Sequence, residues 1–256
     1  MKWAVITGAC GGLGRAFCQL CAEQNYDLIL SGTDEKRLIL LKQELLGRYS
    51  ISIQTYVCDL SKLEDTILFC DYLKQLQIDL LINNAGFGEY CTFEKMSQQT
   101  LMDMNQVNMT SMMLVMHAVL PLMKEKGGYV LNVASTAAFQ PGPMMANYYA
   151  TKAYVLSLSE GAALEMKKDK IHICALCCGP VETEFAQKAH IKHTWAQKLM
   201  MIEPRHAAKI GLDAVYKGKT RVVAGLFNRC IVCLSHLIPH GLLCSIMNYI
   251  QSKRQG

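Results

Sequence analysis

MKWAVITGACGGLG, the sequence of residues 1–14, joins a short apolar run to a glycine-rich turn. The run from Trp3 to Ile6 has the character of a buried parallel strand, and helix-forming residues resume at Leu13. Glycines between a strand and a helix let an anion approach the free N–H groups at the helix N-terminus. A flexible turn without a ligand is the alternative, which the position between strand and helix disfavours. The opening therefore predicts a βα unit with an anion-binding turn.

Strand-like apolar runs alternate with helical stretches along the rest of the chain. The predicted strands cover residues 2–7, 27–32, 51–57, 78–82, 128–134, 171–177 and 221–224. This alternation predicts α/β architecture with a Rossmann-type doubly wound parallel sheet. The chain has 256 residues, of which 51% are hydrophobic, enough for one large domain with helices on both faces of the sheet. We expect that domain to cover residues 1–225, with a helical extension over residues 226–256 packed on it.

Tyr148 and Lys152 stand four residues apart in YYATK, so on a helix they share one face. A free tyrosine has a pKa near about 10, and a nearby ammonium favours the phenolate and lowers that pKa. With the Ser135 hydroxyl available, the spacing predicts a tyrosine that moves protons. Taken alone, the spacing fits a surface helix better, and the glycine-rich turn is what favours the catalytic interpretation.

Five ordered motifs between residue 2 and about residue 225 resemble those of the short-chain dehydrogenase/reductase family, in its compact single-domain branch. They are TGACGGLG at residues 7–14, NNAG at 83–86, Asn108 in VNM, the trio Ser135, Tyr148 and Lys152, and CGPVET at 178–183. The chain departs from the family at Cys178, where proline is usual. We expect that difference to loosen the loop without removing a reacting group.

The resemblance implies an NAD(P)(H)-dependent oxidoreductase that interconverts a ketone and a secondary alcohol. Its implied catalytic residues are Asn108, Ser135, Tyr148 and Lys152. Tyr148 would donate a proton to the nascent alkoxide, Lys152 would bind the nicotinamide ribose, and Ser135 would polarise the carbonyl. Asn108 would hold a water. The implied cofactor-binding residues are Thr7, Gly8, Gly12, Leu13, Gly14, Thr33, Asp59, Leu60, Asn84, Ala85, Gly86, Tyr148, Lys152, Pro180, Val181 and Thr183.

Two of these assignments carry specific roles. Thr183 would contact the nicotinamide carboxamide and so select the face of the ring that meets the substrate. Asp59, after the predicted strand that ends near Cys58, would contact adenine. A simple strand-end turn is an equally weighted alternative for Asp59.

The end of the predicted second strand bears on the choice between NADP(H) and NAD(H). An NAD-specific site usually has an acidic residue there, which accepts a hydrogen bond from the ribose 2′-OH. This strand reads DLILSGTD over residues 27–34, so Gly32 stands at that position and Thr33 where NADP-using relatives often have arginine. Asp34 would oppose a 2′-phosphate if it turned inward. Partners for such a phosphate are available at Ser31, Thr33, Lys36 and Arg37. We favour NADP(H) and leave NAD(H) open.

Residues expected near the substrate are mostly apolar. They are Phe139, Pro141, Met144 and Met145, and, after Thr183, Phe185, Trp195, Leu199, Met200 and Met201. Flexible methionines and aromatic rings suit a bulky apolar substrate, and at least half of these side chains are expected to be ordinary core. We therefore expect a hydrophobic ketone, either steroid-like or a fatty 3-oxoacyl compound.

Residues 226–250 are apolar at helical spacing, with breaks at Pro239 and Gly241. They contain no uninterrupted run of about 18 apolar residues, so we expect no membrane span here. Two short amphipathic helices fit the pattern. We rank three placements for them: packed on the core, buried in an oligomer contact, and, as the minority alternative, lying on a membrane surface.

Charge and cysteine content narrow the classes of partner. The net charge of +5 is modest and the basic residues are scattered, so we expect no nucleic acid. We expect a cytoplasmic protein, because the glycine-rich motif begins almost at Met1 and no secretory signal precedes it. We also expect it to form a homodimer or homotetramer. Three Cys-x-x-Cys pairs are better explained as buried apolar thiols than as zinc ligands: Cys18 and Cys21, Cys174 and Cys177, Cys230 and Cys233. We expect no metal site, including at His190 and His193.

Two rival functions remain open. The first is a dinucleotide-binding sensor or scaffold without turnover, which would be expected to lack part of the catalytic set. The second is a membrane-associated lipid reductase tethered by residues 226–250.

Overall fold

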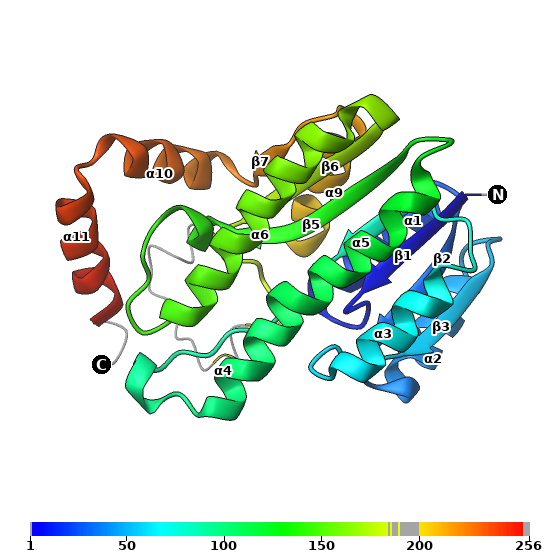
Figure 1. Cartoon of the computed structure of the whole chain (residues 1–256), viewed down its shortest axis with the longest axis horizontal. Helices are drawn as coiled ribbons and strands as arrows, with labels where there is room; N and C mark the ends of the chain where they lie inside the picture. Colours follow the sequence, from blue (N-terminus) through cyan, green and yellow to red (C-terminus); the bar gives the residue numbers. More distant parts are fainter. Residues whose placement is uncertain (1, 184, 186–188, 190–199, 253–256) are drawn as a thin grey trace.

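The structure is a computed structural model that describes residues 2–183, 185, 189 and 200–252. Its centre is a parallel sheet in the order β3-β2-β1-β4-β5-β6-β7 (Figure 1). The strands are β1 (Lys2–Thr7), β2 (Tyr26–Gly32), β3 (Ile53–Val57), β4 (Leu80–Asn83), β5 (Gly128–Ser135), β6 (Ile171–Cys178) and β7 (Arg221–Val223). The seven predicted strands and the doubly wound architecture are confirmed, with boundaries that differ by up to two residues.

Helices cover both faces of the sheet. One face carries α1 (Gly12–Glu23), α2 (Glu35–Leu46) and α9 (Pro204–Tyr216), which pack around Phe17, Leu41 and Leu212. The other carries α3 (Leu63–Leu73), α5 (Met112–Met123) and α6 (Ala146–Glu165), in front of the sheet in Figure 1. The strand order reverses between β1 and β4, and a crevice forms beyond the carboxyl ends of the strands at such a reversal.

One continuous helical segment precedes β5. It consists of α4 (Gln98–Asn105), the π-helical turn η2 (Gln106–Ser111) and α5. By length and composition alone, Gln98–Met123 is apolar enough to cross a membrane. Val115 and Val119 on this segment are fully buried against strand residues such as Val130. Packing on the sheet therefore accounts for part of the apolar character of this segment, of whose most apolar window 44% is buried.

Two helices follow β7 and form the end of the molecule that is orange to red in Figure 1. They are α10 (Leu226–Leu237) and α11 (His240–Ser252), separated at Ile238 and Pro239. The helical extension is thus confirmed.

Buried thiols account for two of the three Cys-x-x-Cys pairs. Cys18 and Cys21 are buried on α1, and Cys174 and Cys177 are buried in β6. The third pair was predicted wrongly, because Cys230 and Cys233 are exposed on α10. Among the described residues, no group of three His, Cys, Asp or Glu side chains is placed to hold a metal ion. His190 and His193 lie outside the described residues.

These thiols make the stability of the fold dependent on pH. Burial raises the pKa of Cys58, Cys174 and Cys178 from 9.0 to about 12. The folded protein keeps protons that the unfolded chain releases, so this stabilisation is complete below about pH 9 and is lost as the pH rises toward 12. Each thiol changes the unfolding free energy by about 1.4 kcal/mol per pH unit in that window. We expect the urea midpoint under reducing conditions to fall steeply from about pH 9 to pH 11; a constant midpoint would contradict this account.

Candidate active site

The glycine-rich turn brings the N-terminus of α1 to the carboxyl edge of the sheet. Gly8 has φ +62°, and a Cβ on Gly14 would lie 2.2 Å from the Gly8 carbonyl oxygen, so both positions require glycine. The N-cap residue of α1 is Gly11, which has no side chain to bond the first N–H groups of the helix. Leu13 and these glycines line a cavity. The turn therefore offers N–H donors and the positive end of a helix dipole to an anion.

Thr7 and Asn84 join the ends of β1 and β4. The Thr7 hydroxyl accepts hydrogen bonds from the backbone N–H groups of Asn84 and Ala85, at 3.0 and 3.1 Å. The Asn84 amide donates to the carbonyl oxygens of Thr7 and Gly8, at 2.9 and 3.0 Å. These bonds hold the two strand ends together under the glycine-rich turn. Thr7 is buried and does not line the cavity, whereas Asn84, Ala85 and Gly86 do.

The end of β2 forms the wall of the cavity beyond the turn. Thr33 is exposed and lines it, together with Arg37, whose Nη2 donates to the Cys10 carbonyl oxygen at 3.0 Å. The Asp34 carboxylate caps α2 by accepting from the Arg37 backbone N–H at 3.0 Å. Asp34 itself lines the cavity, so this bond holds its carboxylate at the N-terminus of α2 without removing the residue from the cavity wall. The Ser31 hydroxyl is buried, borders the same cavity and has no hydrogen-bond partner within the described chain.

Asp59 and Leu60 lie where the sequence predicted, beside the end of β3, and both line the cavity. The Asp59 Oδ1 accepts from the Ser61 N–H at 3.1 Å and the Ser61 hydroxyl at 2.7 Å. One carboxylate oxygen is therefore used by the strand-end turn, as the alternative assignment required. Oδ2 lies 3.9 Å from the Lys62 ammonium.

Asn108 is buried in the π-helical turn η2. Its Oδ1 accepts from the Phe87 N–H at 3.0 Å, and its Nδ2 donates to the Phe87 carbonyl at 2.8 Å and to Thr151 Oγ1 at 3.1 Å. A π-turn inside a helix is rare and is often found at functional sites. Here it accompanies an amide that links the loop following β4 to helix α6.

Lys152 and Tyr148 share one face of α6, as their spacing predicted. The Lys152 Nζ lies 5.8 Å from the centroid of the Tyr148 ring and donates to the Val133 carbonyl oxygen at 2.8 Å. Burial lowers the pKa of Lys152 to about 8. Burial also raises the pKa of Tyr148 well above 10.0, and a hydrogen bond with Ser135 opposes that rise. We expected Lys152 to lower the pKa of Tyr148. Desolvation of Tyr148 by burial raises that pKa instead, so the expected lowering is not found.

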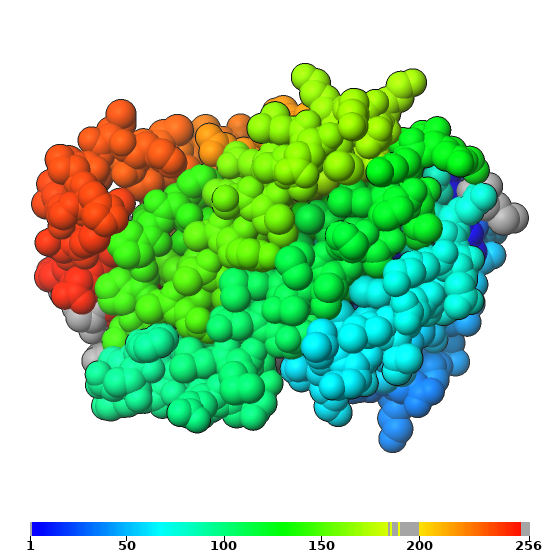
Figure 2. Space-filling view, viewed as in Figure 1, coloured from blue at the N-terminus to red at the C-terminus, as the bar shows by residue number. Residues whose placement is uncertain are grey.

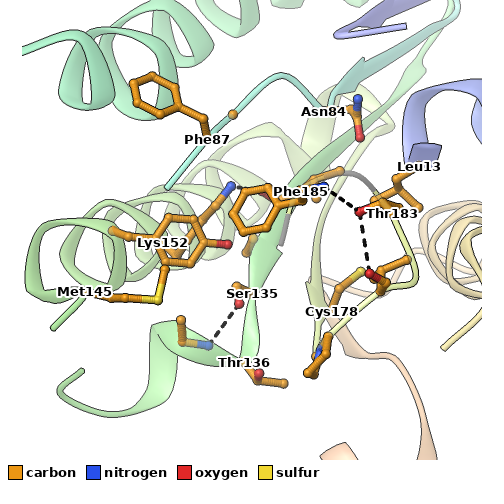
Figure 3. A pocket seen from close by; sticks show the side chains of 18 of the residues that line it. Leu13, Asn84, Phe87, Ser135, Thr136, Met145, Lys152, Cys178, Thr183 and Phe185 are labelled. Atoms are coloured by element: carbon orange, nitrogen blue, oxygen red, sulfur yellow. Dashed lines mark hydrogen bonds between the residues drawn. The ribbon is translucent and has the colours of Figure 1, made fainter. Parts of the chain in front are cut away.

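Ser135 ends β5 and faces the same cavity. Its Oγ accepts from the Ala137 N–H at 3.1 Å, which fixes the hydroxyl at the start of the next turn (Figure 3). Cys178 is its partner in the register of β5 and β6. The nearby Lys152 ammonium lowers the pKa of Cys178, but burial outweighs it and raises that pKa to about 12. Cys178 is thus a neutral, buried thiol next to Ser135.

Thr183 closes the site from the loop that follows β6. A Cβ on Gly12 would lie 2.6 Å from Thr183 Cγ2, so the loop contacts the glycine-rich turn directly. Thr183 Oγ1 accepts from the Phe185 N–H at 3.3 Å (Figure 3). Pro180 and Val181 precede it and line the cavity, and Val181 pairs with Ile202 in an isolated bridge.

The glycine-rich turn, the end of β2, Ser135, Tyr148, Lys152 and Thr183 border a single cavity of about 1140 Å³, whereas Thr7 and Asn108 lie behind its lining. Pockets that hold one drug-sized ligand usually measure about 300–1,000 Å³. The glycine-rich turn and the end of β2 line one part of it, and Ser135, Tyr148 and Lys152 line another. The cavity is therefore large enough for a dinucleotide and a second molecule together.

Sequence reasoning missed the wall that α10 and α11 contribute. Ten residues between Ile231 and Ile250 line the cavity, namely Ile231, Val232, Leu234, Ser235, Ile238, Leu243, Ile246, Met247, Tyr249 and Ile250. The helical spacing of the extension was visible in the sequence. Nothing in that spacing indicates which part of the core the helices would cover.

The predicted substrate-contacting residues lie in different surroundings. Met145, Phe185 and Met200 line the cavity. Phe139 packs instead against the core and the ring of His236. Trp195 and Leu199 lie outside the described residues.

Comparisons with known proteins agree with this geometry. Residues 2–193 match the profile of the family described as short chain dehydrogenase. A short-chain dehydrogenase from Sphingobium yanoikuyae in complex with NADPH has a TM-score of 0.83 and 27% identity, covering 88% of this chain and 89% of its own.

Two curated relatives are longer than this chain. The very-long-chain 3-oxoacyl-CoA reductase of Laccaria bicolor is 31% identical over 176 residues, which are 67% of this chain and 52% of the relative. The human inactive hydroxysteroid dehydrogenase-like protein 1 is 27% identical over 214 residues, 80% of this chain and 64% of the relative. The family profile covers most of the chain. In the chain's parallel sheet, the glycine-rich turn and the cluster of Ser135, Tyr148 and Lys152 line the same cavity. The chain therefore belongs to the short-chain dehydrogenase family.

Proposed function

We propose that this protein is an NADP(H)-dependent oxidoreductase that interconverts a ketone and a secondary alcohol on a bulky apolar molecule. One observation carries the proposal: Ser135, Tyr148 and Lys152 border the same cavity as the glycine-rich turn. The turn fits a dinucleotide, because its N–H groups suit a diphosphate and the Ser31 hydroxyl beyond it is buried and unpaired within the described chain. A bound nicotinamide supplies the hydride chemistry.

The chain's own residues would manage the proton and the carbonyl. Ser135 would donate a hydrogen bond to the carbonyl oxygen and hold it near Tyr148. Tyr148 would donate its phenolic proton as negative charge develops on that oxygen. An ammonium on Lys152 would stabilise the resulting phenolate, and its pKa of about 8 keeps the proton exchangeable near neutral pH. Asn108 would hold the loop after β4 against α6 through Phe87 and Thr151.

NADP(H) is favoured by the end of β2. Arg37 borders the cavity there, and the carboxylate of Asp34, which also lines the cavity, is bonded to the N-terminus of α2. The bound NADPH in the Sphingobium yanoikuyae relative supports this assignment. The apolar lining from α10 and α11 supports a large apolar substrate, and a 3-oxoacyl or steroid-like ketone agrees with the names of the curated relatives.

A non-catalytic dinucleotide sensor is the second candidate, favoured by the relative named as inactive. The complete set of Asn108, Ser135, Tyr148 and Lys152 in this chain argues against it. The test is a panel of ketones and secondary alcohols of increasing size, assayed with NADPH and NADH separately at the nicotinamide absorbance. We expect turnover of bulky apolar ketones with NADPH. Tight NADPH binding without turnover of any member would favour the sensor.

Replacing Thr33 by aspartate should reverse the preference between the two cofactors. A carboxylate at this exposed position on the cavity wall repels a 2′-phosphate and accepts from a 2′-OH. We expect the ratio of the NADPH and NADH dissociation constants to change by about ten- to a hundredfold. Thr33→Asn is the uncharged control and should leave the ratio within about twofold. An unchanged ratio in Thr33→Asp would place the ribose elsewhere.

A further inference from the structure

The C-terminal helices α10 and α11 are held on the domain by one narrow stripe each. Asn228, Val232 and Ser235 are buried on α10, and Leu243, Met247 and Gln251 on α11. The stripe is anchored by polar bonds as well as by apolar contacts. The Asn228 amide donates to the Ala224 carbonyl at 2.8 Å, and the Gln251 amide donates to the Tyr149 hydroxyl at 3.0 Å. Because these contacts hold the buried stripe of each helix against the domain, the other side of each helix points away from the domain.

On α10 the opposite face is apolar rather than polar. A surface helix normally presents polar residues opposite its buried stripe. Here the outer face consists of Leu226, Phe227, Leu234 and Leu237 of α10, which are 74%, 61%, 56% and 81% exposed, together with Leu242 of α11, which is 55% exposed beside the exposed polar residues Ser245 and Asn248. Figure 2 shows α10 and α11, orange to red, at one end of the molecule. Contiguous exposed apolar surface of this kind is typical of an interaction site.

The charge of the segment indicates what covers the outer face. Residues 226–256 contain Arg229, Lys253 and Arg254 but no aspartate or glutamate. In a symmetric contact between two copies, this segment would meet itself and bring like charges together without an acidic partner. An anionic lipid surface provides both an apolar layer and the opposite charge.

The outer face is continuous with the rim of the cavity. Ile231, Leu234, Ile246, Tyr249 and Ile250 line the cavity and are 39%, 56%, 37%, 60% and 41% exposed. Leu226, Phe227, Leu237 and Leu242 lie outside the cavity lining, so closure over a substrate would not account for their exposure. A surface that contacts the outer face therefore also meets the entrance to the site.

We propose that the outer face of α10 and α11 docks on the surface of a bilayer that contains anionic lipids. Docking would place the cavity rim at the apolar layer, so that an apolar ketone reaches the site directly from the lipid. The route of the substrate rests on the proposed function, whereas docking itself does not.

Vesicle flotation of the full-length protein tests the docking. The vesicles are phosphatidylcholine alone and phosphatidylcholine mixed with phosphatidylglycerol. We expect the parent to float with the mixed vesicles, more weakly at high salt, and the double variant Phe227→Ser/Leu237→Ser to bind about tenfold or more weakly. Leu40→Ser/Leu68→Ser is the matched control, because these leucines are 63% and 61% exposed on α2 and α3. The control should bind like the parent, and all forms should melt alike.

Two outcomes would overturn the docking proposal. One is a parent that does not float with either vesicle. The other is a parent oligomer whose mass, measured by light scattering, falls to that of the monomer in Phe227→Ser/Leu237→Ser, since the outer face would then be a contact between copies.

Activity measurements separate this proposal from the proposed function. With a water-soluble ketone, the Phe227→Ser/Leu237→Ser variant should match the parent, because neither residue lines the cavity. With a long-chain ketone held in mixed vesicles, it should be about tenfold slower. Equal rates for the vesicle-held ketone would overturn the entry route. Vesicle binding without turnover of any ketone would refute the proposed oxidoreductase function and leave the docking intact.

Discussion

Replacing Tyr148 by phenylalanine should reduce the rate of ketone reduction by about 10²–10⁴-fold, the contribution typical of a general acid. The substitution removes only the hydroxyl and keeps the ring. The centroid of that ring lies 5.6 Å from the centroid of the Phe185 ring and 6.3 Å from that of the Tyr149 ring. The glycine-rich turn and Lys152 are unchanged, so NADPH affinity should stay close to that of the parent. Single-turnover rates and NADPH dissociation constants measure the two effects separately.

The control for this variant is Tyr154→Phe. Tyr154 lies on the same helix and its hydroxyl contacts the Met113 sulfur at 3.1 Å, away from the cavity lining. It should retain activity within about twofold of the parent. If Tyr148→Phe kept a rate within about tenfold of the parent, Tyr148 would not be the proton donor.

Removing α10 and α11 by truncation before Leu226 should give an aggregating or much less stable protein, even in the absence of lipid. The truncation exposes the groups that Val232, Leu243 and Met247 cover, and these three side chains are at most 8% exposed. Each buried apolar side chain of this kind contributes roughly 1.5–3 kcal/mol, which the ordering of the two helices offsets in part. It also removes the apolar wall of the cavity, so turnover of bulky ketones should be lost. Thermal melting and light scattering measure the first effect.

Point variants on α10 test the same contacts without deleting them. Val232→Ser, at an 8% exposed position, should lower the melting temperature, whereas Leu237→Ser, at an 81% exposed position, should leave it unchanged. A truncated protein that stays monodisperse and melts like the parent would show that the extension adds no stability to the domain.

The parallel α/β architecture and the spacing of the candidate site residues could be predicted from local sequence. Seven apolar runs separated by helical stretches leave few topologies, because crossovers between parallel strands are right-handed and require intervening helices. Glycine is required at positions 8 and 14 by the backbone geometry of one short turn. The spacing of Tyr148 and Lys152 reflects the repeat of a single helix. Each of these signals lies within a few residues of the structure that it determines.

The protonation of the site depended on contacts that are distant in the sequence. The Tyr148 pKa is raised and the Lys152 pKa lowered because neighbouring segments bury both groups. The sequence also left open what the Asp34 carboxylate bonds, and the structure shows that it accepts from the Arg37 N–H while the residue still lines the cavity. Desolvation and hydrogen bonding depend on which surfaces meet, and spacing along the chain carries no such information.

The extension shows the same division most clearly. Its sequence was sufficient to predict two amphipathic helices, because an apolar repeat and the break at Pro239 and Gly241 are local features. Only the tertiary structure showed that one side of these helices lines the cavity and that the other side stays exposed although it is apolar. A helix that is apolar on most of its circumference has no single preferred face. The surface that it buries is selected by the shape of the domain against which it packs.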